Sequence, residues 1–259
     1  MLASITLQPG HPSGIYPFNV PAVQSLTTLN FSNSRITFFT GENGSGKSTL
    51  LEAIALNYGL SLDGGNRNFA FEADLPKDDT YPLARALKLG FVPYRSGEGF
   101  FFRAETLFNL ATRLDELDAQ DTGALNLPPV LGGYGGQSLH TRSHGEAFLT
   151  VLDHKFRRSG LFLLDEPEAA LSPQRQLSFL ILIHDTLRDY KDAQFIISTH
   201  SPILLGYPNA QIVSFDDGTL QEIPYEETAP AVIVQRFLND RKNFIAELFQ
   251  ETPGLFDED

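Results

Sequence analysis

The segment GENGSGKS at residues 41–48 constrains the fold of this chain more than any other part of it. It matches the pattern G-x-x-x-x-G-K-[ST], a loop whose backbone N–H groups and lysine surround phosphate oxygens. An apolar segment at 35–40 precedes the loop, and STLLEAIALNYGL (48–60) follows it with apolar residues at helical spacing. This order predicts a strand, a loop and a helix whose N-terminal dipole attracts phosphate. The sequence therefore predicts a nucleotide site.

The residues of this loop have distinct predicted tasks. We expect Lys47 to reach the β- and γ-phosphates, Ser48 to hold Mg²⁺ and Thr49 to contact the α-phosphate. The other expected nucleotide contacts in the loop are Asn43, Gly44, Ser45 and Gly46. A glycine-rich turn with a solvated lysine is the alternative, and the predicted strand and helix on either side disfavour it.

Two carboxylates follow a short apolar run further along the chain. Leu161 to Leu164 has the composition of a buried strand, and Asp165 and Glu166 come directly after it. Ligands of doubly wound sheets bind at the carboxyl ends of strands. We expect Asp165 to orient Mg²⁺ and Glu166 to act as the general base on the attacking water. Acidic residues also follow strands simply because the chain leaves the core there, but the phosphate-binding loop upstream favours catalysis.

A second apolar strand is predicted at 195–199, and it ends at His200, which can hydrogen-bond a γ-phosphate. Amphipathic helices are predicted at 143–156 and 174–190. The alternation of strands and helices predicts an α/β fold with a mainly parallel core sheet.

The sequence also predicts the surroundings of this core. The expected elements are antiparallel edge strands at 26–31 and 35–40 after an irregular entry, a short helix at 83–90, a further strand at 211–215, a turn at 216–218 and a closing helix over 230–250. We expect one domain, residues 1–259, with a small helical lobe at about 65–158 inserted between the two halves of the nucleotide site.

Two segments compete as a glycine-containing signature loop. Tyr134 to Ser138 reads YGGQS, and Ser143 to Glu146 reads SHGE. Position favours the second, because it opens the amphipathic helix that leads into the acidic strand. Ser143 as helix cap with Glu146 three residues later is also a plain capping box, which explains the same residues without a functional role.

The phosphate-binding loop, SHGE, LFLLDEPEAALSP and IISTHSP, in this order, resemble the nucleotide-binding domain of ABC ATPases. The chain is most similar to the small stand-alone ATPases grouped with SMC-like AAA proteins, over most of residues 16–207. The resemblance implies ATP hydrolysis with Mg²⁺ and an ATP-dependent homodimer that drives a protein partner. It also implies that Ser143, Gly145 and Glu146 close over the γ-phosphate of the other subunit's nucleotide, and that residues 167–172 form the D-loop.

The chain departs from the ABC pattern at several positions. His144, Glu146 and Ser172 replace a glycine, a glutamine and an aspartate, which disfavours a transporter subunit. Arg103 falls on the position of the Q-loop glutamine, so metal coordination there is open, with Glu105 or Gln137 as possible replacements. Tyr16 and Phe18 are the candidates for stacking on adenine, with ordinary packing as the alternative. About forty residues separate the Q-loop and signature positions, which leaves no room for long coiled-coil arms.

Charge and composition limit the partners. The chain has 19 Lys and Arg against 32 Asp and Glu, a net charge of −13, which repels nucleic-acid phosphates. Nucleic acid is therefore a possible partner that the charge does not support. With no cysteine the chain has no thiolate zinc site. The sequence shows no transmembrane segment or signal peptide, and we expect a cytoplasmic protein.

Three functions remain in competition. The first is an ATPase head that dimerises around ATP to drive a partner protein. The second is the ATP-binding subunit of an ABC transporter. The third is the ATPase of a DNA-repair or anti-phage defence system that acts with a nuclease or a toxin.

Overall fold

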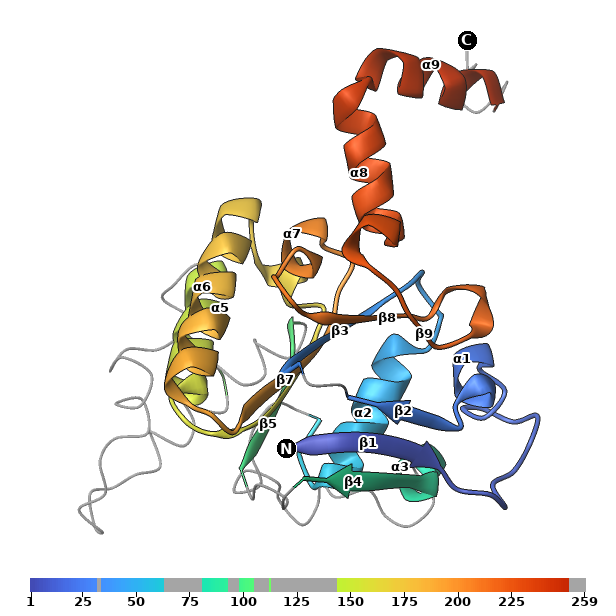
Figure 1. Cartoon of the computed structure of the whole chain (residues 1–259), viewed down its shortest axis with the longest axis vertical. Helices are drawn as coiled ribbons and strands as arrows, with labels where there is room; N and C mark the ends of the chain where they lie inside the picture. The colour runs from blue at the N-terminus through green and yellow to red at the C-terminus, as the bar shows by residue number, and fades with distance from the viewer. Residues whose placement is uncertain (32–33, 63–80, 93–97, 105–111, 113–143, 252–259) are drawn as a thin grey trace.

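The computed structural model describes residues 1–31, 34–62, 81–92, 98–104, 112 and 144–251. Most of the expected helical lobe at 65–158 lies outside these residues. The described part forms two sheets with helices packed on them (Figure 1).

The main sheet contains the predicted strands of the nucleotide site. Its six strands run in the order β5-β6-β7-β3-β8-β9. Their bounds are Gly99–Arg103 for β5, Gly160–Asp165 for β6, Ala193–Ser198 for β7, Ile36–Thr40 for β3, Gln211–Ser214 for β8 and Gln221–Glu222 for β9. Neighbouring strands from β5 to β8 are parallel, and β9 pairs antiparallel with β8. The predicted α/β fold with a mainly parallel core sheet is confirmed.

A second, smaller sheet lies apart from the first. It has the order β2-β1-β4 and is antiparallel throughout. Its strands are β1 Leu2–Leu7, β2 Thr28–Asn30 and β4 Leu87–Phe91. Helix α2 (Lys47–Tyr58) packs between the two sheets, with the short helices α1 (Pro21–Ser25) and α3 (Pro82–Ala86) beside it (Figure 1).

The opposite face of the main sheet is covered by α5 (His144–Phe156) and α6 (Pro173–Asp189), with the short α7 (Pro202–Leu205) near their end (Figure 1). Phenylalanines dominate this side of the core. The Phe156 ring lies 4.8 Å from that of Phe162 and 4.9 Å from that of Phe195. Phe100 and Phe102 are also buried here. The aromatic residues of the sheet therefore pack the core, as the scarcity of basic residues around them predicts.

The C-terminal segment differs from its predicted form. The prediction of a single helix over 230–250 was wrong. Helix α8 (Ala229–Asn239) stops before Asp240, whose φ of −148° and ψ of 68° are not helical, and α9 (Arg241–Glu251) begins directly after it. Both helices project from the body of the molecule (Figure 1). Ile233 and Leu238 on α8 are exposed.

Three further expectations need correction. Ile36–Thr40 is an internal strand between β7 and β8 rather than an edge strand. The predicted helix at 83–90 ends at Ala86, and Leu87–Phe91 forms β4 because it pairs with β1, a strand missed in the predicted irregular entry. Gly90 serves this pairing, since a Cβ there would lie 2.6 Å from the Ser4 hydroxyl. Among the described residues no helix has the length and apolar character needed to cross a membrane.

Candidate functional site

The phosphate-binding loop joins β3 to α2, as predicted. Gly44 and Gly46 have φ values of 82° and 103°, in the left-handed region that favours glycine. Gly46 is also packed closely, because a Cβ at this position would lie 2.7 Å from Val20 Cγ1. The backbone turn at Gly46 starts α2 at Lys47, and so directs the N-terminus of the helix toward the loop.

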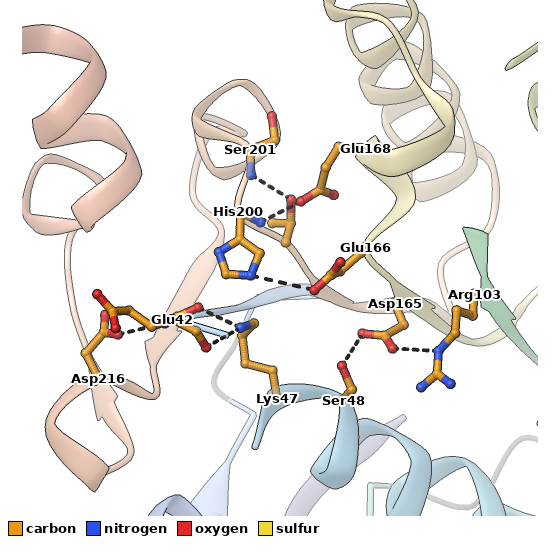
Figure 2. A network of polar contacts seen from close by, with 12 residues as sticks. Glu42, Lys47, Ser48, Arg103, Asp165, Glu166, Glu168, His200, Ser201 and Asp216 are labelled. Atoms are coloured by element: carbon orange, nitrogen blue, oxygen red, sulfur yellow. Dashed lines mark hydrogen bonds and ion pairs between the residues drawn. The ribbon is translucent and has the colours of Figure 1, made fainter. Parts of the chain in front are cut away.

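Lys47 lies inside this loop. Its side chain is 4% exposed, and its ammonium Nζ donates to the carbonyl oxygens of Gly41 at 2.6 Å and Glu42 at 2.9 Å (Figure 2). Burial lowers the pKa of Lys47, while the carboxylates of Glu166 and Asp165 oppose this shift. The loop therefore holds a buried cation close to the two carboxylates at the end of β6.

Asp165, the last residue of β6, is 3% exposed and has both carboxylate oxygens occupied. Ser48 Oγ donates to its Oδ1 at 3.0 Å, and Arg103 Nε donates to its Oδ2 at 2.9 Å (Figure 2). The strand pairing explains the second contact, because Arg103 at the end of β5 is the register partner of Asp165. The structure thus brings the two predicted metal ligands together, with a guanidinium beside them.

Glu166 follows Asp165 and has a left-handed backbone, with φ 47° and ψ 53°. This conformation costs a non-glycine residue about 1–2 kcal/mol. The backbone N–H of Glu166 donates to Ser198 O at 2.9 Å, which ties the turn to the end of β7. Glu166 Oε1 lies 3.6 Å from His200 Nε2 (Figure 2). The two residues predicted to act at the γ-phosphate are therefore neighbours.

His200 titrates under opposing influences. Burial lowers its pKa, as does the charge of Lys47, whereas the carboxylates of Glu166, Asp216 and Asp165 raise it. The net direction is downward from the usual 6.5. The His200 ring, which is close to Glu166, can hydrogen-bond a ligand at this edge of the sheet.

Glu168 is a site residue that the sequence reasoning missed. It lies in the 3₁₀ turn η5 (Pro167–Ala170), and its Oε1 accepts the backbone N–H of His200 at 2.6 Å (Figure 2). Burial raises the pKa of Glu168, although the hydrogen bond from the His200 backbone opposes this. The carboxylate joins the turn after β6 to the loop after β7. A carboxylate two residues after Glu166 was the available signal, but its partner could not be read from spacing.

Asp216 was also missed. Its Oδ1 accepts the backbone N–H of Glu42 at 3.0 Å (Figure 2). Its Oδ2 accepts the Ser214 hydroxyl at 3.0 Å. It belongs to the 3₁₀ turn η6 (Asp216–Gly218), in the segment predicted only as a hairpin turn. A cavity of about 450 Å³ lies between this turn and the loop residues Asn43, Gly44 and Ser45. Asp216 therefore fixes one side of the phosphate-binding loop.

The predicted signature residues lie elsewhere, at the start of α5. Glu146 pairs with Arg175 Nη2 of α6 at 3.0 Å. A Cβ on Gly145 would lie 2.8 Å from Arg175 Cδ and 3.1 Å from Ala170 O, so this glycine allows close packing. Ser143, the alternative segment at 134–138, and the proposed Q-loop replacements Glu105 and Gln137 lie outside the described residues.

The two candidates for adenine stacking differ in exposure. Phe18 is 2% exposed and stacks on His11, with ring centroids 4.8 Å apart, which makes it a core residue. Tyr16 is 67% exposed, and its hydroxyl lies 3.4 Å from the Thr49 hydroxyl. Of the two candidates, Tyr16 is therefore the exposed one, and it lies beside the start of α2.

The sheet order and the site together define a P-loop nucleotide site on a mainly parallel sheet. The phosphate-binding loop follows β3, the paired carboxylates follow β6 and the histidine follows β7, which are adjacent parallel strands.

Two family models match parts of the chain. A family model described as "AAA domain" matches residues 14–80, and a second, described as "AAA domain, putative AbiEii toxin, Type IV TA system", matches residues 138–206. The first match contains the phosphate-binding loop, and the second contains the signature segment, Asp165, Glu166 and His200. No curated protein matches the chain.

Solved structures resemble the chain at low identity. The ATP-binding subunit of an ABC transporter is 17% identical, with 97% of this chain and 99% of that chain covered and a TM-score of 0.47. The SMC head domain from Thermotoga maritima is 16% identical, with 86% and 98% covered and a TM-score of 0.44.

Proposed function

We propose that this chain binds ATP with Mg²⁺ at the carboxyl edge of its main sheet and hydrolyses it, and that two copies close around the nucleotide to drive a partner protein. The supporting observation is the distribution of buried polar atoms that lack a hydrogen-bond partner. In the described part of the chain these atoms are Thr40 Oγ1, Ser45 Oγ, Glu168 Oε2, Ser198 Oγ and His200 Nε2. All five come from the ends of β3, β6 and β7 or the loops that follow, and this concentration favours a polar ligand there.

The donor set fits the proposed ligands. Mg²⁺ in nucleotide sites takes one or two protein oxygen ligands together with substrate phosphates, and the Ser48 hydroxyl and the Asp165 carboxylate supply such oxygens. Mg²⁺ bound there would neutralise charge on the β- and γ-phosphates. Lys47 exchanges its carbonyl acceptors for phosphate oxygens, because charged acceptors bind an ammonium more strongly.

In the proposed hydrolysis, Glu166 and His200 act on the attacking water and the γ-phosphate. Glu166 accepts a proton from the water that attacks the γ-phosphorus, the bond from that phosphorus to the bridging oxygen breaks, and ADP leaves with the electron pair. His200 donates a hydrogen bond from its ring to a γ-phosphate oxygen and so orients the group for attack. We assign the signature segment to the nucleotide of a second copy because the resemblance to ABC ATPases implies it; within one chain Gly145 and Glu146 lie against Arg175.

ATP binding is tested with Lys47→Ala. Removal of a buried charged donor costs about 1.5–3 kcal/mol, which is roughly a 10- to 150-fold loss of ATP affinity. Isothermal titration at fixed Mg²⁺ measures it, and Lys191→Ala, on an exposed turn, is the matched control. Equal ATP affinity in the Lys47 variant and wild type would refute the nucleotide site.

Dimerisation is tested in a variant that retains ATP. Glu166→Gln keeps the shape of the site without the base, and we expect light scattering to show a dimer when ATP and Mg²⁺ are added. Ser143→Arg in the same background should abolish the dimer and leave nucleotide binding nearly unchanged. A Glu166→Gln protein that stays monomeric with bound ATP would show that the chain acts without this interface.

A second candidate function is favoured by the family match at 138–206, whose description names a toxin of a type IV toxin–antitoxin system. In this alternative the chain is the ATPase of a defence system and acts with a nuclease or toxin. ATPase assays with and without DNA, RNA and co-purified proteins distinguish the two. The net charge of −13 predicts that nucleic acid alone leaves the rate unchanged.

A further inference from the structure

We propose that Arg103 is a built-in competitor of Mg²⁺: it occupies Asp165 in the nucleotide-free protein and so raises the Mg²⁺ concentration at which the site binds MgATP. This inference rests on the proposed function, because it takes Asp165 as the metal-orienting carboxylate.

The contacts place the guanidinium on the expected metal ligand itself. Asp165 is buried, and its two oxygens are divided between the Ser48 hydroxyl at 3.0 Å and Arg103 Nε at 2.9 Å. A cation that approaches Ser48 and Asp165 therefore meets a positive charge already bonded to the same carboxylate. A glutamine at this position would offer an oxygen, whereas arginine carries five N–H donors and no acceptor. Arg103 can oppose the metal but cannot ligate it.

A second carboxylate makes the competition reversible. Arg103 Nη2 also pairs with Glu52 on α2, so the guanidinium lies between carboxylates from two different elements (Figure 2 shows the Asp165 contact). When Asp165 turns to a metal, Arg103 retains Glu52 as its partner and is not left as an isolated buried charge. A cavity of about 140 Å³ adjoins Arg103, Ser48, Asp165 and Glu166, which leaves room for such a movement.

The arrangement predicts opposite effects for its two partners. Arg103→Gln removes the competing charge and also offers an oxygen, and the Mg²⁺ concentration that gives half-maximal ATP binding should fall at least about tenfold, the usual weight of a charge-assisted hydrogen bond. Arg103→Met removes the charge without offering an oxygen, and its midpoint should fall as well, which isolates the effect of the charge. Glu52→Gln removes the alternative partner, binds Arg103 more firmly to Asp165 and should raise that concentration severalfold. Arg103→Lys keeps the charge and should stay close to wild type.

The experiment is a Mg²⁺ titration of ATP binding, measured by calorimetry at fixed ATP, together with thermal melting of nucleotide-free protein in MgCl₂. We expect Mg²⁺ alone to stabilise Arg103→Gln at lower concentrations than wild type. Arg158→Gln, which removes an exposed ion pair to Glu98, is the matched control and should change neither readout.

The outcomes separate this inference from the proposed function. A midpoint that is unchanged or raised in Arg103→Gln would overturn the competition, and so would a lowered midpoint in Glu52→Gln. If Arg103→Gln does not fold, the rise expected for Glu52→Gln decides alone. Failure of wild type to bind ATP at any Mg²⁺ concentration would instead refute the proposed function.

Discussion

Asp165 and Glu166 are neighbours in the chain, yet they differ in burial, backbone conformation and hydrogen bonding. Asp165 is 3% exposed, ends a regular strand and has hydrogen bonds to both oxygens. Glu166 has a strained left-handed backbone, its side chain is 43% exposed, and its Oε1 lies 3.6 Å from His200 Nε2. The Asp165 carboxylate therefore has hydrogen-bond partners without a ligand, whereas the Glu166 carboxylate is partly exposed to solvent.

The difference separates binding from chemistry. The charge of Asp165 is balanced by Arg103, and in our proposal a metal must displace this partner. The backbone N–H of Glu166 bonds to Ser198 O, while its partly exposed carboxylate lies 3.6 Å from His200 Nε2. Substitutions of Asp165 should therefore change Mg²⁺ and MgATP binding, whereas substitutions of Glu166 should change the rate of hydrolysis.

The largest effect is expected for substitution of Glu166, the proposed general base, on the rate of ATP hydrolysis. Glu166→Gln preserves the side-chain shape but removes the base, and we expect the hydrolysis rate to fall about 10²- to 10⁴-fold with ATP affinity retained. A phosphate-release assay measures the rate, and calorimetry measures the affinity. Asp165→Asn is the matched comparison and should weaken Mg²⁺ dependence and MgATP binding instead. Equal losses of ATP affinity in both variants would contradict the separate roles of Asp165 in binding and Glu166 in hydrolysis.

His200→Ala should give the next largest effect. It removes the ring that we propose to hydrogen-bond the γ-phosphate, so we expect turnover at saturating ATP to fall roughly 10- to 100-fold, as for loss of a hydrogen bond to a charged group. His184→Ala is the control, because His184 lies exposed on α6 and contacts Tyr207. Steady-state kinetics decide, and a wild-type rate in His200→Ala would return this residue to a structural role.

The smallest expected effect is on stability. Burial raises the pKa of Glu168, so the folded protein keeps this proton to higher pH than the unfolded chain does. Stability from this group is therefore complete below about 4.5 and is lost as pH rises through the folded pKa. Glu168→Gln keeps an acceptor for the His200 N–H without the buried charge. It should be more stable than wild type near pH 7, by on the order of 1 kcal/mol.

The measurement for Glu168 is chemical denaturation of both proteins between pH 4 and 8. The stability difference should shrink toward acid pH, and Glu227→Gln, an exposed substitution in η7 (Tyr225–Glu227), should show no such trend. A variant that is less stable than wild type throughout the range would mean that the carboxylate stabilises its loop in the ionised form.

Sequence reasoning worked where a signal is contained in one short segment. The phosphate-binding loop, the strands before Asp165 and His200, and the helices at 144–156 and 173–189 follow from spacing and composition. It failed at β1 and β4, because neither segment forms a strand without the other, and at Asp240, where the apolar pattern continues through a break in the helix.

By itself the sequence determined the class of fold and the loops that carry the chemistry, since backbone conformation and strand or helix periodicity are local properties of the chain. Only the tertiary structure decided which side chains meet. Asp216 bonds to the loop at Glu42, 174 residues away, Glu168 bonds to His200, and Arg103 bonds to Asp165 rather than leaving it to a metal. No periodic pattern in the sequence predicts these contacts, because the order of strands in the sheet, not distance along the chain, brings their residues together.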